Sequence, residues 1–193
     1  MDLDGGVNFN KYALPNKFLT SFLHGRSQWN GRLIIGSGSN LLKVKSNLHG
    51  VGSTLPHPFD KEAGVSLDSE IHFNRLESGE RVLVLKIVNL LAARISHKGG
   101  ETSGKVSIGA NSRGEKVDKG LKVDLKNLDL DSWRVIYEGF IKNRGRVDSN
   151  AGFSLRSFLN SVDFKVGSLK WLDRKFDLVN LKAEKEGSFW KGF

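Results

Sequence analysis

The sequence contains no cysteine, so neither a disulfide nor a thiolate metal site can hold the chain together. This absence fits a reducing and an oxidising compartment equally well. The sequence also lacks a run of about eighteen apolar residues, which excludes a membrane-spanning helix within it. At 193 residues, the chain is long enough for one large domain or two small ones with a real core.

The two ends of the sequence lack familiar signals as well. Met1 is followed by Asp-Leu-Asp-Gly-Gly, which has neither the basic start nor the apolar core of a signal peptide. At the other end, apolar residues are still present at Phe189, Trp190 and Phe193. We therefore expect residues 1–193 to be a single fragment of a longer protein, with no internal domain boundary.

Positive charge is in excess, with 30 basic and 21 acidic residues and a formal net charge of +9. This excess favours anionic partners such as nucleic acid, acidic lipid headgroups or lipopolysaccharide phosphates. The basic residues are scattered singly, however, which is also typical of a solvated basic surface. A basic binder of nucleic acid or another anionic polymer is therefore one alternative function.

Four tryptophans could in principle provide a stacking surface for single-stranded nucleic acid: Trp29, Trp133, Trp171 and Trp190. The sequence has no signature of an oligonucleotide-binding fold or an RNA-recognition motif. Trp133 also lies on the apolar side of a predicted helix, which favours a place in the core. We expect no nucleic-acid partner.

Alternating apolar and polar residues recur along the chain, separated by short turns that use many of its 22 glycines. Short links between such segments indicate neighbouring antiparallel strands. The sequence predicts a mainly β (α+β) fold, an open, trough-like and strongly curved antiparallel sheet of about ten strands with two or three helices. The strands are expected at about 29–36, 40–48, 66–76, 80–89, 91–97, 104–110, 118–128, 162–172, 175–185 and from 188 onward.

Two of these segments indicate how the sheet is buried. The segment 82–88 is apolar on both faces, which predicts a strand that is covered twice and lies centrally in the sheet. The segment 118–128 alternates cleanly, with Leu121, Val123 and Leu125 on one face and charged residues on the other.

Three segments have helical patterns. Residues 15–24 place apolar side chains on one side and are followed by Gly25, a typical C-terminal cap. A second helix is expected at about 132–142, with Asp131 as its N-terminal cap. A short third helix is expected at about 153–160.

Residues 99–105, Gly-Gly-Glu-Thr-Ser-Gly-Lys, satisfy most of a phosphate-binding loop. Such a loop needs a Ser or Thr after its lysine and a helix after that. Here Val106 follows, and residues 105–109 alternate like a strand. The segment therefore predicts a hairpin instead of a nucleotide site.

Other candidates for chemistry are weak. Asp129 and Asp131 could be paired carboxylates for acid–base work, but a strand-to-helix junction with a capping aspartate explains them more simply. We expect no enzyme activity and no catalytic, cofactor-binding or metal site. The histidines lack the spacing of metal ligands: His24, His49, His57, His72 and His97.

The most informative stretch is residues 46–64, with the order Ser-x-Leu-x-Gly-(x)4-Leu-Pro-x-Pro-(x)2-Lys. Pro56 and Pro58 cannot donate ladder hydrogen bonds and favour extended residues before them, which predicts a rigid connection between two strands. This order resembles a signature of the AsmA-like envelope proteins of the YhdP and TamB type. Residues 121–133, with Leu-Asp-Leu-Asp-Ser-Trp, and residues 162–190, a meander with a Trp after its hairpin, resemble the same family in the same order.

The resemblance implies a scaffold from the C-terminal part of a YhdP-like protein, because no invariant catalytic residue belongs to the pattern. Proteins of this family are long periplasmic molecules, anchored in the inner membrane of Gram-negative bacteria. Their curved sheets form an apolar trough associated with phospholipid transport towards the outer membrane. The implied partners are phospholipid acyl chains, neighbouring β-segments of the same chain, and the membrane through parts of the parent that are absent here.

A lipid trough sets a physical requirement. Moving an acyl chain of about sixteen carbons from hydrocarbon to water costs roughly 13 kcal/mol, so the wall must supply on the order of 500 Å² of apolar surface at about 25 cal/mol per Å². Ordinary monomers rarely expose so large a patch. A closed core would give the same alternation, and a module that pairs through exposed sheet edges is a further alternative. The candidate wall residues are Val82, Leu83, Val84, Leu85, Ile87, Leu121, Val123 and Leu125.

Overall fold

The computed structural model describes residues 1–10, 17–109, 120–142 and 159–192. Its strands are β1 (Asp2–Asn8), β2 (Leu23–Ile35), β3 (Asn40–Ser46), β4 (Val51–Ser53), β5 (Ser69–Arg75), β6 (Arg81–Ile87), β7 (Leu91–Lys98), β8 (Glu101–Gly109), β9 (Gly120–Asp129), β10 (Ser161–Trp171), β11 (Arg174–Glu186) and β12 (Phe189–Gly192). The helices are α1 (Lys17–Thr20) and α2 (Leu130–Lys142). Neither helix has the length and hydrophobicity needed to cross a membrane.

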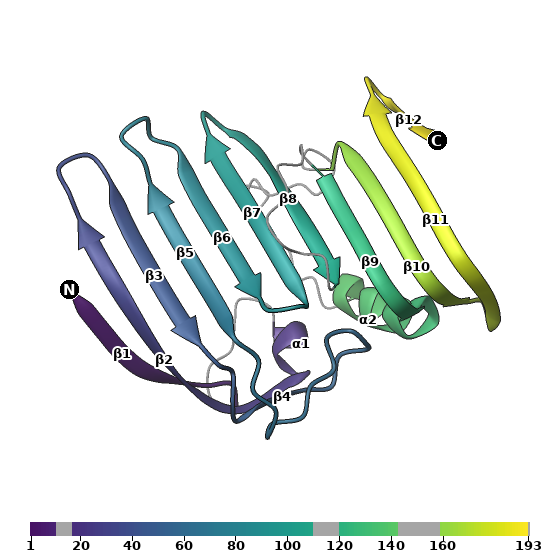
Figure 1. Ribbon diagram of the computed structural model, residues 1–193, viewed down its shortest axis with the longest axis horizontal. Helices are drawn as coiled ribbons and strands as arrows, with labels where there is room; N and C mark the ends of the chain where they lie inside the picture. Colours follow the sequence, from purple (N-terminus) through teal and green to yellow (C-terminus); the bar gives the residue numbers. More distant parts are fainter. Residues whose placement is uncertain (11–16, 110–119, 143–158, 193) are drawn as a thin grey trace.

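The strands form one sheet of twelve in the order β1-β2-β3-β5-β6-β7-β8-β9-β10-β11-β12, with β4 paired to β2 off this path (Figure 1). The sheet is open, and β1 and β12 lie at its two edges. Strand β6 has neighbours on both sides, which confirms its predicted place inside the sheet. The prediction that both of its faces are covered is wrong, because Leu83 is 37% exposed.

The sheet is mixed, so the prediction of a wholly antiparallel sheet is wrong. Strands β1 to β8 along the path pair antiparallel, as do β10 to β12. Strand β9 instead runs parallel to both β8 and β10. Between β9 and β10 the chain forms α2, and such a crossover lets both strands start from the same end of the sheet.

The predicted helix at 15–24 is wrong beyond Thr20, and its first two residues lie outside the described part. Leu23 begins β2 because it pairs with Ser53 of β4. Gly25, expected as a helix cap, is also part of β2. Strand pairing with β4 thus replaces the last helical turn.

The second predicted helix is confirmed, since α2 covers the segment expected at 132–142. Of the third, expected at 153–160, all but the last two residues lie outside the described residues. Residues 159–160 are not helical.

Sequence patterning predicts neither β1 nor β4. Strand β1 pairs with β2 along its whole length, and the Asp2 carboxylate lies 2.7 Å from Arg32 Nε. Glycine interrupts the apolar alternation of β1. Gly5 lies against the Trp29 ring, and a Cβ at this position would collide with that ring.

The two faces of the sheet differ in chemistry. Residues paired across strands point to the same face, so Leu85, Ala93, Val106 and Leu121 share one face, the apolar face. This face also carries Leu33, Leu42, Val44, Ile71, Phe73, Leu83, Ile87, Ile95, Ile108, Val123, Leu125 and Phe164. The opposite, polar face carries Asn30, Arg32, Lys43, Lys45, Glu70, His72, Val82, Val84, Lys86, Arg94, Lys105 and Lys122.

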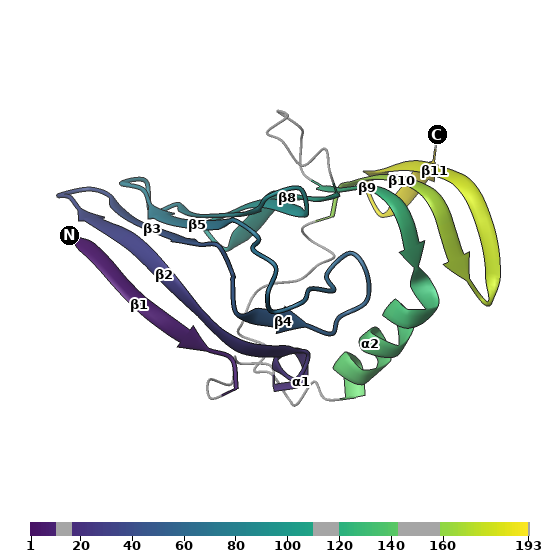
Figure 2. The same cartoon turned by 60° about the horizontal axis from the view of Figure 1, so that its bottom comes forward.

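The main hydrophobic core lies where α2 meets β9 and β10. Val123, Leu128, Val166 and Leu169 are buried there, and Trp133 of α2 packs against them. Because Val123 belongs to the apolar face, α2 covers that face at this end of the sheet. Figure 2 shows α1, β4 and α2 on the same side of the sheet.

Candidate functional site

Part of the apolar face remains exposed among the described residues. Phe73 pairs with Leu83 and Ile71 pairs with Leu85 across β5 and β6. Ile71, Phe73 and Leu83 are 42%, 43% and 37% exposed, although all three are large apolar side chains on strands in the middle of the sheet. Their exposure makes the apolar face the first candidate site.

The predicted wall residues fall into three places. Leu83, Leu85 and Ile87 lie on the apolar face in β6, outside the core cluster. Val82 and Val84 lie on the polar face, because they pair with Asn74 and His72.

The wall residues of β9 share the apolar face but lie at its covered end. Val123 is buried in the core, and Leu121 and Leu125 pack against the same cluster with Trp133. The structure therefore brings the predicted wall residues of β9 and three of those of β6 to the apolar face. Helix α2 covers the part of this face at β9.

Lys61 stabilises the Gly-rich bend at residues 48–52. It is the last residue of the sequence order described above for residues 46–64. Lys61 Nζ donates to the carbonyl oxygens of Leu48 (2.9 Å), Val51 (2.7 Å) and Glu62 (3.1 Å). Burial lowers the pKa of this ammonium group. Its three acceptors are neutral carbonyls, so Lys61 stabilises the bend and is not a charge offered to a ligand.

The same bend passes very close to β2. Gly25 and Gly50 both have positive φ, of 94° and 87°. A Cβ at Gly25 would collide with the Gly50 carbonyl oxygen, and one at Gly50 would collide with that of Arg26. Glycine is required at this crossing both for backbone conformation and for space.

The tip of the following loop, residues 54–65, contacts α2. Trp133 Nε1 donates a 2.9 Å hydrogen bond to the His57 carbonyl oxygen. The Phe59 and Trp133 rings pack edge to face, with centroids 5.7 Å apart and planes at 83°. These contacts place the Pro-x-Pro turn over the covered end of the apolar face, and Trp133 itself is half-buried and packs against the core.

A cleft of about 1300 Å³ lies between this loop and the end of the sheet. We call it the loop cleft. Sequence reasoning missed it, although apolar residues recurring in a loop rich in Gly and Pro are a signal that the loop is covered. Its apolar lining includes Leu23, Leu48, Val51, Leu55, Pro58, Phe59, Val65, Leu67, Ile87, Val88, Leu90 and Leu125.

The carboxylates at the start of α2 have structural partners. Asp129 Oδ1 accepts hydrogen bonds from the amides of Asp131 and Ser132, both 3.0 Å, so Asp129 is the cap and the prediction of Asp131 is wrong. The Ser132 amide is the main reason why the pKa of Asp129 is lowered.

Asp131 instead braces the β10–β11 turn. Its two carboxylate oxygens accept from the amides of Leu172 (2.8 Å) and Asp173 (2.9 Å), and the Asp173 amide is the main cause of its lowered pKa. These contacts favour capping and bracing over acid–base chemistry.

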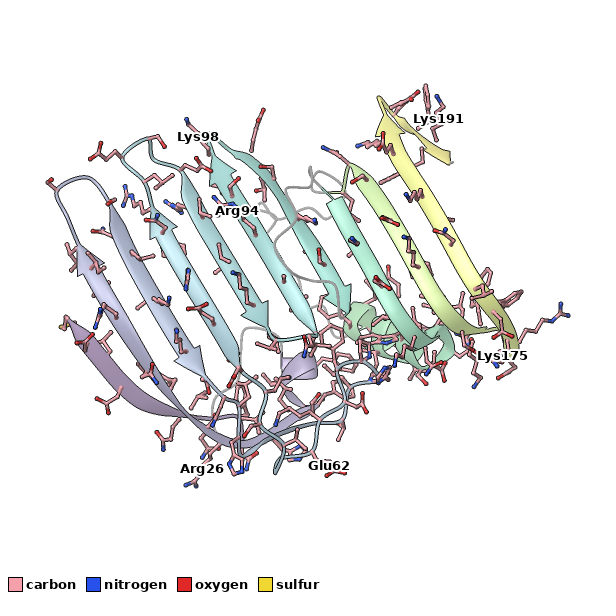
Figure 3. The ribbon with its side chains drawn as sticks, viewed as in Figure 1. Arg26, Glu62, Arg94, Lys98, Lys175 and Lys191 are labelled. Carbon is pink, nitrogen blue, oxygen red and sulfur yellow. The ribbon has the colours of Figure 1, made fainter. Side chains whose placement is uncertain are left out.

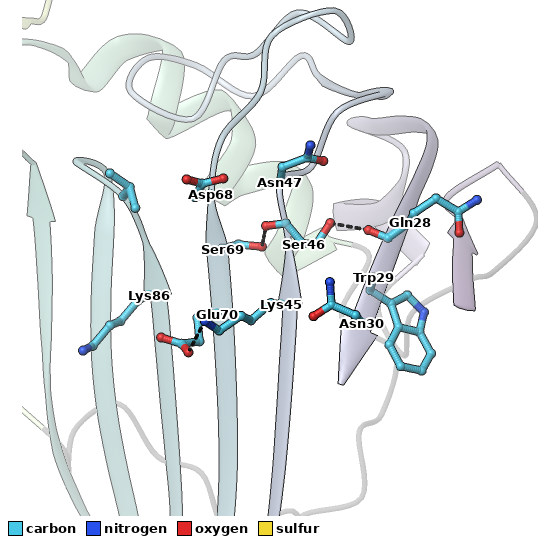
Figure 4. A pocket seen from close by; sticks show the side chains of 11 residues that line it. Gln28, Trp29, Asn30, Lys45, Ser46, Asn47, Asp68, Ser69, Glu70 and Lys86 are labelled. Carbon is cyan, nitrogen blue, oxygen red and sulfur yellow. Dashed lines mark hydrogen bonds and ion pairs between the residues drawn. The ribbon is translucent and has the colours of Figure 1, made fainter. Parts of the chain in front are cut away.

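An ionic cluster lies on the polar face. Glu70 Oε1 is 2.7 Å from Lys43 Nζ, 3.0 Å from His72 Nε2 and 3.6 Å from Lys45 Nζ. The hydrogen bond from Lys43, followed by that from His72, lowers the pKa of Glu70 to about 2. Figure 4 shows Glu70 beside Lys45 in a shallow hollow of about 600 Å³ that is lined mainly by polar side chains.

The motif that resembles a phosphate loop is a hairpin, as predicted. Gly99 and Gly100 form the turn, and Glu101 to Lys105 belong to β8, which pairs with β7. Among the described residues, no group of three or more potential ligands is arranged for a metal ion.

The chain matches the family model described as "YhdP protein" over residues 1–191. No curated protein and no solved structure matches the chain. The family match covers nearly the whole chain and confirms the resemblance of residues 46–64, 121–133 and 162–190. The chain belongs to the YhdP protein family, which is linked to lipid transport in the cell envelope.

Proposed function

We propose that this chain is a non-enzymatic section of a periplasmic conduit that carries phospholipid between the inner and outer membranes and so maintains the outer-membrane barrier. Membership of a family linked to envelope lipid transport supports this proposal. The apolar face would be the wall of a curved trough that holds acyl chains, and the polar face would meet water. The membrane anchor would lie in other parts of the parent protein.

The observation that carries the proposal is a row of apolar side chains that crosses the strands. Val44, Ile71, Leu85, Ala93, Val106, Leu121 and Val162 are paired in succession from β3 to β10. The part from Val44 to Val106 lies outside the end that α2 covers, and its four gaps between strands, each about 4.8 Å, give a row roughly 19 Å long. One leaflet is about half of a hydrocarbon core of roughly 30 Å, so the row is long enough for an acyl chain lying across the strands.

Neighbouring rows widen this wall. Leu33, Leu42, Phe73, Leu83 and Ile95 form a second paired row directly beside the first. Two adjacent rows offer a surface on which an apolar chain can lie without meeting a charged side chain. The two rows are therefore the kind of continuous apolar wall that an acyl chain requires.

Site-specific photocrosslinking tests the proposal in cells. A benzophenone amino acid at Phe73, on the apolar face, should capture phospholipid, whereas the same probe at Asn74, the next residue of β5 on the opposite face, should not. The two positions share a strand and present opposite faces; Phe73 is exposed and Asn74 is half-buried. Capture at neither site, or equally at both, would contradict a lipid-bearing apolar face.

A second candidate function, pairing with partner strands, is favoured by the sheet edges. Among the described strands, β1 pairs only with β2, and β12 pairs only with β11. Such edges can bind further strands, including neighbouring β-segments of the same chain. Lysine substitutions in β1 that abolish a pulled-down partner, while capture of lipid at Phe73 is unchanged, would favour this function.

A further inference from the structure

We propose that one phospholipid molecule binds where the loop cleft meets a basic pocket, with an acyl chain in the cleft and its phosphate in the pocket. This inference rests on the proposed function, because it takes phospholipid as the ligand. It adds a defined headgroup site, and a cleft bounded by the loop, to what would otherwise be an open wall.

The loop cleft has the size and chemistry for an apolar tail. Its volume of about 1300 Å³ exceeds the roughly 300–1000 Å³ of common small-molecule pockets. Leu90 and Leu125 contribute from the sheet end, and Leu55 and Phe59 contribute from the loop. The contact between Trp133 and His57 keeps the loop in place over the cleft.

The basic pocket lies beside it, at the β10–β11 turn, with a volume of about 510 Å³. Arg174 has no ion pair among the described residues, and Lys175 is 3.4 Å from Asp177. Arginine presents a planar fork of donors that binds phosphate with two hydrogen bonds, so we assign Arg174 as the main phosphate ligand. Lys175 is assigned as the second cation, because its partner Asp177 does not line the pocket. The lining residues are His57, Asn127, Leu128, Asp129, Ser168, Lys170, Asp173, Arg174 and Lys175.

The pocket also contains carboxylates, and their charges are already engaged. Lys170 Nζ lies 3.7 Å from Asp129 and 3.8 Å from Asp173. Asp129 also accepts amide hydrogen bonds at the start of α2. Lys170 therefore offsets one of these two negative charges and is not assigned to the phosphate. With Arg174 and Lys175, the lining has three cations against two carboxylates.

The cleft and the pocket are adjacent. His57 lines both of them. Lys126 and Gly167 line the cleft, whereas the next residues, Asn127 and Ser168, line the pocket. An apolar cleft beside a pocket with more cations than carboxylates is complementary to an amphiphile with an anionic head. In Figure 3, Lys175 of β11 and Glu62 of the loop 54–65 both lie in the lower part of the view, where the strands end.

Calorimetric titration with dihexanoyl phosphatidic acid, below its critical micelle concentration, tests this site on the purified chain. The double variant Arg174→Ala/Lys175→Ala should weaken binding at least roughly tenfold, as expected for lost charged hydrogen bonds. The control Lys182→Ala/Lys185→Ala removes the same charge from the same strand and should leave binding unchanged. Thermal melts of each variant establish that it is folded.

The cleft is tested with a filling variant. Val65→Trp adds bulk at a cleft-lining residue that is 51% exposed, and Ile34→Trp does the same on the polar face, at a residue that is 52% exposed. Only Val65→Trp should weaken binding. Dihexanoylglycerol, which lacks phosphate, and inorganic phosphate, which lacks a tail, should each bind at least roughly tenfold more weakly than the lipid.

Three results would overturn the inference: binding that survives the Arg174/Lys175 substitutions, equal loss in both double variants, or inorganic phosphate binding as tightly as the lipid. These failures are distinguishable from failure of the proposed function. Lipid capture at Phe73 would persist if only the headgroup site is wrong, and it would be absent if the apolar face does not hold lipid.

Discussion

Trp133 Nε1 donates a 2.9 Å hydrogen bond to the carbonyl oxygen of His57, although 76 residues separate the two in the sequence. Trp133 packs on the core of β9 and β10, and His57 lies in the Pro-x-Pro turn. This single side chain therefore joins two of the three stretches that carry the family resemblance. It also fixes one wall of the loop cleft.

Replacing Trp133 with Phe should keep the aromatic packing and remove only the hydrogen bond. We expect a loss of about 1 kcal/mol or less in the free energy of unfolding, measured with urea, because the His57 carbonyl loses this hydrogen bond. Amide hydrogen exchange should rise in residues 54–65. Trp171→Phe is the control, because Trp171 is 49% exposed and its indole has no hydrogen bond in the described structure; an equal effect of both variants would contradict the role of Trp133.

Replacing Lys61 with Met should destabilise the bend at residues 48–52. The substitution keeps the apolar stem but leaves three carbonyls without the ammonium donor. Hydrogen bonds from a charged group contribute about 2 kcal/mol, and a comparable loss is expected in urea unfolding. Lys86→Met, on the exposed polar face, should change stability little; the prediction fails if both variants behave alike.

Glu70 should make stability depend on pH in the acid range. Its pKa is about 2 in the folded chain and 4.5 in its ordinary state. A lowered carboxyl pKa stabilises the fold fully above the ordinary value, and this stabilisation is lost as pH falls from 4.5 towards 2.

Glu70→Gln should therefore lower stability at neutral pH by about 1 kcal/mol, after allowing for partial exposure of the ion pairs. It should also flatten the pH dependence of unfolding in the acid range. Glu77→Gln serves as the control because Glu77 is exposed and has no ion pair in the described residues. An unchanged pH profile in Glu70→Gln would show that the ionic cluster does not stabilise the fold.

The β10–β11 turn offers a stabilising substitution. Leu172 and Asp173 have φ of 53° and 58°, and Leu172 is 59% exposed. Leucine adopts this left-handed conformation at a cost of about 1 kcal/mol, which asparagine largely avoids. Leu172→Asn should raise the thermal midpoint, whereas Leu181→Asn, in the regular strand β11, should not; a fall for Leu172→Asn would contradict this account of the turn.

The sequence predicts the elements whose signal is local. Alternation locates β5 to β7 as short hairpins, and the two apolar faces of residues 82–88 place β6 in the middle of the sheet. The amphipathic pattern predicts helix α2, but it does not identify the capping residue. Asp129 and Asp131 are both suitable caps, and only the position of the β10–β11 turn decides that Asp131 braces that turn.

The remaining features depend on contacts between distant residues. The parallel pairing of β9 with β10 follows from the crossover through α2, which a strand pattern does not encode. Strand β4 is only Val51–Ser53 and exists because Gly25 and Gly50 allow two backbones to meet. The loop cleft depends on Trp133 reaching His57, so the candidate wall could be named from sequence, but the cleft beside it could not.

The most direct test of the central claim is the phospholipid occupancy of the full-length parent protein, measured by native mass spectrometry after extraction from cells. We predict bound phospholipid in the wild type, clear loss in Phe73→Ser/Leu83→Ser on the apolar face, and retention in Val84→Ser on the polar face. A wild-type protein without bound phospholipid, or full occupancy in the Phe73/Leu83 variant, would contradict the claim that the apolar face holds lipid.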